Sequence, residues 1–66
     1  MDTPYLGKNG HIAIATNYIE RAMNYLENVL GVEFAKETAK RDDKGVLKAI
    51  YLKEEIGGFA VHLVQK

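Results

Sequence analysis

The chain of 66 residues contains no cysteine, no tryptophan and a single proline. Without cysteine it can form neither a disulfide nor a cysteine-bound zinc knuckle. It also lacks an apolar run of the roughly 20 residues that a membrane-spanning helix requires. Nine Lys and Arg balance nine Asp and Glu, and no basic patch stands out that would favour nucleic-acid binding. These absences favour a small cytoplasmic domain without membrane or nucleic-acid partners.

A chain this short buries only about 60% of its unfolded surface, and its core supplies roughly 3–5 kcal/mol of net stability. Because disulfides and cysteine-bound zinc are excluded, we expect a partner surface or a neighbouring domain to add to this stability. Residues 1–9 are polar, contain Gly and Pro, and do not resemble a signal peptide. They predict a linker leading into one domain at residues 10–66, with Tyr5 as either an anchor to a preceding domain or a tail residue.

Residues 18–30 repeat apolar side chains every three or four positions, which is typical of an amphipathic helix. Thr16 or Asn17 offers an N-cap oxygen, and with Asn17 as the cap Glu20 completes a capping-box arrangement. Gly31 follows the last turn, where a left-handed C-cap residue is expected. The apolar stripe, which we expect to face a sheet, consists of Ile19, Ala22, Met23, Leu26, Val29 and Leu30.

Strand-like alternation, or enrichment in β-branched and aromatic residues, occurs in four stretches. They are residues 11–16, 32–39, 46–53 and 59–65. Asp and Gly in residues 41–45 predict a turn between two of these strands. The two glycines in residues 54–58 predict a hairpin turn and not a phosphate-binding loop, because no helix follows them.

This order predicts an α+β fold, with one amphipathic helix on a four-stranded, mostly antiparallel sheet. If each strand keeps its period of two, the helix-facing side of the sheet carries Ile12, Ile14, Phe34, Ile50, Leu52, Phe59, Val61 and Leu63. The opposite side, here called the open face, carries His11, Ala13, Ala15, Glu33, Ala35, Ala49, Tyr51, Ala60, His62 and Val64. Its many alanines leave room for a ligand or a second sheet, so we expect self-association through this face.

The stretch HIAIATNYIERAMNYLENVLGVEF resembles the opening strand and helix of a vicinal-oxygen-chelate module. Such a module is the βαβββ half-module of glyoxalase, bleomycin-resistance and dioxygenase-like proteins, and the resemblance covers residues 10–65. In metal-binding members, a residue that begins the first strand and one in the last strand ligate the ion. These positions correspond to His11 and His62. The usual last-strand ligand is Glu, so His62 departs from the family's pattern.

The stretches GKNGHIAIAT and EIGGFAVHLVQK are similar to the C-terminal extension of some bacterial KHG/KDPG aldolases. These lyases cleave 2-keto-4-hydroxyglutarate and 2-keto-3-deoxy-6-phosphogluconate with a Schiff-base lysine inside a barrel, which needs about 200 residues. The resemblance implies an accessory domain for assembly or small-ligand sensing, with an aldolase barrel preceding residue 1 and no catalytic residue of its own. The alternatives are a metal-dependent, glyoxalase-like half-site at a homodimer interface and a stand-alone small-molecule-binding dimer.

His11 and His62 are the sharpest site candidates, because imidazole is a common ligand for divalent Zn, Ni and Fe. A homodimer would bring two copies of each histidine to one cavity. The alternative is that both are interface or strand-end histidines paired with backbone or carboxylate groups. Tyr51 is a candidate ligand-binding residue on the same face, or a half-buried packing residue with a solvated hydroxyl. Glu33 and Glu37 lean towards the cavity or lie on solvated edges.

Overall fold

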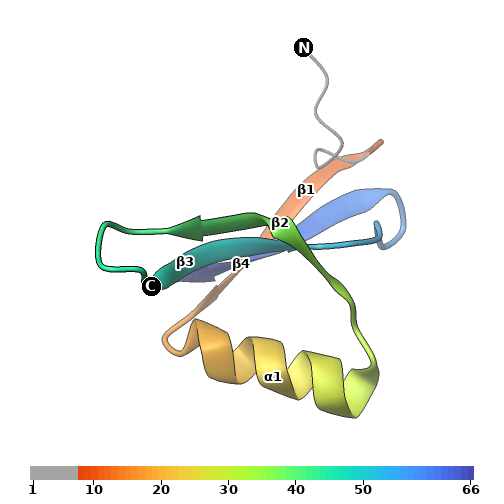
Figure 1. Cartoon of the computed structure of the whole chain (residues 1–66). Helices are drawn as coiled ribbons and strands as arrows, with labels where there is room; N and C mark the ends of the chain where they lie inside the picture. The colour runs from red at the N-terminus through yellow and green to blue at the C-terminus, as the bar shows by residue number, and fades with distance from the viewer. Residues whose placement is uncertain (1–7) are drawn as a thin grey trace.

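The computed structural model describes residues 8–66, which form one helix and one sheet (Figure 1). The elements in chain order are β1 (Gly10–Thr16), α1 (Ile19–Leu30), β2 (Phe34–Arg41), β3 (Leu47–Leu52) and β4 (Phe59–Gln65). The predicted α+β class and the βαβββ order are confirmed. Tyr5 and most of the predicted linker lie outside the described residues.

The sheet has the strand order β1-β4-β3-β2, so the first and last strands of the chain are neighbours. β1 runs parallel to β4, whereas the β4–β3 and β3–β2 pairs are antiparallel. The sheet is therefore mixed and mostly antiparallel, as predicted. α1 lies along one face only and packs on β3 and β4, which leaves the other face of the sheet open (Figure 1).

The core lies between α1 and the sheet, as the helix periodicity predicts. Its buried side chains are Ile19, Phe34, Leu47, Ile50 and Leu63, with Ala22, Met23 and Leu26 packed against them. The helix ends as expected at Gly31, which adopts the left-handed conformation with φ 69°. This conformation lets the amide of the next residue, Val32, donate a hydrogen bond back to the carbonyl of Leu26.

The helix covers less of the sheet than the sequence predicts. Ile12 and Ile14 of β1 share the helix-facing side with Val61 and Leu63, their partners in β4. They are nevertheless 44% and 46% exposed, because α1 lies over β3 and β4 and does not reach the edge strand. The prediction that the helix buries these two isoleucines is therefore wrong.

Val29 and Leu30, predicted as part of the buried stripe, are also exposed. They lie in the last turn of α1, beyond the side chains that reach the buried core. The predicted second strand begins and ends two residues later than expected, at Phe34 and Arg41. The delay has a local cause, because the left-handed turn at Gly31 is closed by Val32 before the chain can extend.

The start of α1 is capped by the last strand of the chain and not by the predicted capping box. Tyr18 occupies the cap position and makes no side-chain cap hydrogen bond. Instead, the Ile19 amide donates to Oε1 of Gln65 at 2.9 Å, and Nε2 of Gln65 donates to the carbonyl of Asn17 at 2.6 Å. Thr16 contributes through its hydroxyl oxygen, which accepts from the Tyr18 amide. This arrangement ties the helix start to the end of β4.

The β3–β4 hairpin closes through Gly57 and Gly58, at the position where the sequence predicts a turn. Both glycines have positive φ, at 61° and 82°, as a type I′ turn requires. Ile56 and Phe59 exchange two backbone hydrogen bonds across the turn. Asn9 binds the same turn, since its amide donates to the carbonyl of Gly58 and its side chain to that of Gly57. The start of β1 is thereby fixed beside the start of β4.

Candidate functional site

Three ring side chains from three adjacent strands form a row on the open face. His62 of β4 lies in the middle and stacks on Tyr51 of β3, with ring centroids 4.5 Å apart. On its other side lies His11 of β1, with ring centroids 5.8 Å apart. The strand register explains the row, because Tyr51 is the pairing partner of His62 and His11 lies two residues before its partner on β1. The prediction that both histidines share one face is confirmed.

Small side chains surround this row of rings. Ala13 of β1 is the direct partner of His62, and Ala49 of β3 lies two residues before Tyr51 on the same face. Ala35 and Ala60, the partners of Tyr51 and His11, are buried. The alanines keep the floor of the face low, so that the rings of the row stand above it.

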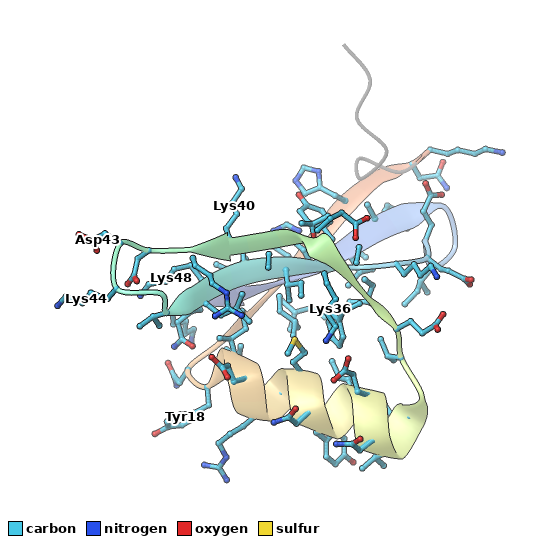
Figure 2. The ribbon with its side chains drawn as sticks, in the orientation of Figure 1. Tyr18, Lys36, Lys40, Asp43, Lys44 and Lys48 are labelled. Carbon is cyan, nitrogen blue, oxygen red and sulfur yellow. The ribbon has the colours of Figure 1, made fainter. Side chains whose placement is uncertain are left out.

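Lys40 brings a positive charge to the open face. It pairs with Ala49, and Figure 2 shows its side chain pointing away from α1. The sequence did not identify this residue, because the predicted second strand ends at residue 39. A register shift between Ala35 and Lys40 carries the strand further. Thr38 stabilises this bulge, since its hydroxyl donates to the carbonyl of Ala35 and accepts from the Tyr51 amide.

The environment of His62 favours the neutral imidazole. Burial lowers its pKa below the ordinary value of 6.5, and the nearby charges of His11 and Lys40 lower it further. Its Nδ1 atom is buried and has no hydrogen-bond partner within residues 8–66. A buried ring nitrogen without a partner is costly. A rotation of the ring that exposes this atom would let a ligand pair with it and remove that cost. The site therefore has an unsatisfied polar atom at its centre.

The histidine pair partly fits a metal ion. Two imidazoles on one tetrahedral zinc, each with a Zn–N distance of about 2.0–2.1 Å, have ring centroids about 5 Å apart. The observed 5.8 Å separation is close to this value. However, residues 8–66 contain no cluster of three or more His, Cys, Asp or Glu side chains that could hold a metal. One copy of the chain supplies two ligands, and the remainder would have to come from a second copy or from a bound ligand.

Glu33 and Glu37, the two glutamates named from the sequence, do not lie together at the row of rings. Glu33 lines a separate hollow of about 230 Å³ between the end of α1 and the β3–β4 turn, together with Glu54 and Glu55. Glu37 lies in the bulged part of β2 and is exposed. Glu33 and Glu37 are both exposed, as the alternative of solvated edge carboxylates predicts.

No family model matches the chain, and neither the curated proteins nor the solved structures contain a match to it. Within residues 8–66, no helix is long and apolar enough to cross a membrane. The features that bear on function are the row formed by His11, Tyr51 and His62, with Lys40 beside it, and the two family resemblances of the sequence.

Proposed function

We propose that this chain is a non-catalytic accessory domain that binds a small, carboxylate-bearing ligand on its open sheet face. The observation that supports this function best is the unpartnered Nδ1 of His62 at the centre of the row of rings. Lys40 and His11 provide charge complementarity for an anion on either side of it. The proposed parent is a cytoplasmic aldolase of the KHG/KDPG class, whose substrates are 2-keto acids.

A 2-keto acid suits this arrangement for a chemical reason. Its carboxylate accepts charge-assisted hydrogen bonds from an imidazole N–H and from the ammonium group of Lys40. In the proposed accessory role, these side chains bind and orient the ligand and do not transform it.

The second candidate function is a metal half-site completed at a dimer interface, which the separation of His11 and His62 favours. The two functions have opposite pH dependence. Binding of an anion strengthens when the imidazoles gain a proton, whereas a metal requires neutral imidazole and binds more weakly as the pH falls. Affinities at about pH 7.5 and about pH 5.5, on either side of the ordinary imidazole pKa of about 6.5, therefore separate an anion site from a metal site.

Calorimetric titration with 2-ketoglutarate, and separately with Zn²⁺ and Ni²⁺, tests both functions on the same protein. We expect saturable binding of 2-ketoglutarate that tightens at the lower pH and is lost in the His11→Ala, His62→Ala double variant. Lys40→Ala weakens it, whereas Lys44→Ala removes the same charge from the tip of the β2–β3 hairpin (Figure 2) and leaves it unchanged. Equal weak binding by all variants at both pH values would exclude the site.

The coding sequence upstream of Met1 tests the proposed parent separately. An open reading frame that continues upstream into a barrel with a Schiff-base lysine is the expected result. A stop codon in frame directly before Met1 would contradict the aldolase assignment while leaving the ligand site intact.

A further inference from the structure

The two edge strands of the sheet are protected very differently. β2 has the sequence FAKETAKR, with four charged side chains, and its ladder to β3 contains register shifts. Charges and bulges on an edge strand prevent pairing with a strand of another chain. β1 has the sequence GHIAIAT, with no Asp, Glu, Lys, Arg or Pro, and pairs with β4 in unbroken register over seven residues. The edge at β2 is protected, and the edge at β1 is not.

The backbone of β1 presents hydrogen-bonding groups at this unprotected edge. The carbonyl of Thr16 accepts from the Lys66 amide, so the backbone groups of Thr16 point towards β4. Successive residues of a strand point their N–H and C=O groups in opposite directions within the sheet. The groups of Ile14 and Ile12 therefore point towards β4 as well, and those of Ala13 and Ala15 point outward, where they can form a ladder with another strand.

Apolar side chains flank this edge on the helix side. The ion pair between Glu27 and Lys36, at 3.1 Å, identifies the flank of α1 that faces β2. Tyr25 and Val29 lie about 200° around the helix from Glu27, on the flank nearer β1, and both are exposed, as is Tyr18 at the cap position. Figure 2 shows Tyr18 projecting from the start of the helix. Arg21 lies over the Tyr18 ring, 5.4 Å from its centroid. The exposed side chains of this flank and Ile12 and Ile14 of β1 lie on the same side of the sheet, beside the unprotected edge.

The geometry points to a second copy of this chain as the occupant, with its β1 paired antiparallel to β1 about a two-fold axis. β1 carries no Asp, Glu, Lys or Arg, so two identical strands can meet without repulsion between permanent charges. A two-fold contact uses the same patch on both copies and closes the assembly. The resulting eight-stranded sheet would end in the protected β2 edge on both sides, which prevents further growth. If the partner were a different protein, there would be no comparable reason for the β2 edge to be charged and bulged while the β1 edge is neither.

The available surface is of the right size for such a contact. A standard interface buries about 800 Å² on each partner, which is about a sixth of the chain's 4780 Å². The seven residues of β1 are exposed or half-exposed throughout. Together with the exposed residues on the flank of α1, the residues of β1 make up a comparable fraction of the chain. Pairing through this edge leaves the open face free for a ligand, so the contact does not depend on the proposed ligand function.

Sedimentation velocity over a concentration series, with Ala13→Pro and Ala13→Ser, tests this contact. Proline removes an outward N–H without touching the ladder to β4, and serine keeps that N–H. Because both copies lose a donor, we expect the dissociation constant of Ala13→Pro to rise tenfold or more. Ala13→Ser should stay close to the wild type. Ile14→Lys, which places a charge beside the axis in both copies, should also dissociate the dimer, and circular dichroism will verify that each variant is folded.

Amide hydrogen exchange gives a second readout that does not depend on any substitution. The amides of Ala13 and Ala15 should become protected as the concentration rises, whereas that of Ile14 should be protected at every concentration. A wild type that stays monomeric throughout the series overturns the proposal. So does a dimer that Ala49→Lys, on the open face, dissociates while folded Ala13→Pro and Ile14→Lys do not, because the copies would then meet through that face.

Discussion

Gly58 and Gly45 have nearly the same φ angle but different surroundings. Their φ angles are 82° and 83°, so a side chain at either position costs about 1–2 kcal/mol. A Cβ atom on Gly58 would lie 2.6 Å from Nδ2 of Asn9, whereas one on Gly45 meets nothing within 4 Å. At Gly58, the side chain of Asn9 would have to leave its hydrogen bond to Gly57.

We therefore predict that Gly58→Ala destabilises the fold more than Gly45→Ala does. The expected difference is about 0.5–1.5 kcal/mol, the contribution of one hydrogen bond. Chemical denaturation of the two variants measures it. Equal losses would show that Asn9 does not hold the start of β1 against the β3–β4 turn.

His62 makes the stability of the chain pH-dependent. Its pKa is lowered in the folded state, mainly by burial, from an ordinary value of 6.5. As the pH falls below this value, the unfolded chain binds more protons than the folded chain. The free energy of unfolding should therefore decrease as the pH drops from about 6.5 towards the lowered pKa.

Denaturation curves between about pH 7.5 and about pH 5, across the ordinary histidine pKa, should show this decrease. His62→Phe keeps a ring on Tyr51 but cannot be protonated, so its curve should be flatter over the same range. The same decrease in wild type and His62→Phe would assign the effect to other groups.

The positions of His11, Tyr51 and His62 on one face were predictable, because the period of two in each strand fixes which side chains share a face. Lys40 was not predictable. Its place depends on the bulge that Thr38 stabilises. The alternation of side chains along a strand gives no sign of a register shift. The row of rings therefore follows from local patterns, while the charge beside it follows from tertiary pairing.

At the scale of elements, α1 depends on its packed face. Leu26 packs against the core, and Asn24 is exposed on the opposite side of the helix. We predict that Leu26→Ala costs about 2 kcal/mol or more, since truncation leaves a cavity. Asn24→Ala should stay within about 0.5 kcal/mol of the wild type. Thermal melting of both variants measures the difference, and comparable losses would mean that the helix is rotated from the orientation described.

The helix itself was predictable from its apolar stripe and from Gly31, but its beginning was not. Local signals at Thr16 and Asn17 indicate a capping box, yet the cap comes from Gln65, more than forty residues away. Sequence patterns near a helix end cannot identify such a distant partner. The exposure of Ile12 and Ile14 was missed for a related reason, because strand order decides which strands a single helix covers.

At the scale of the whole molecule, the chain uses the two sides of its sheet differently. α1 and the core cover β3 and β4 on one side, and the row of rings lies on the other. β1 belongs to both regions, since it carries His11 on the open face and the two exposed isoleucines on the helix side. One short edge strand thus contributes to the proposed ligand site and to the proposed contact with a second copy.

The ligand site on the open face is tested most directly by ¹⁵N NMR of the imidazole nitrogens during titration with 2-ketoglutarate. The chain has only two histidines, so a single-histidine variant assigns each signal. The account predicts a saturable shift of the His62 Nδ1 signal, accompanied by shifts at His11 and at the Ala49 amide, while the amide of Asn24 on the far side of α1 stays unchanged. An unchanged Nδ1 signal at saturating ligand, or shifts confined to the hollow beside Glu33, would contradict it.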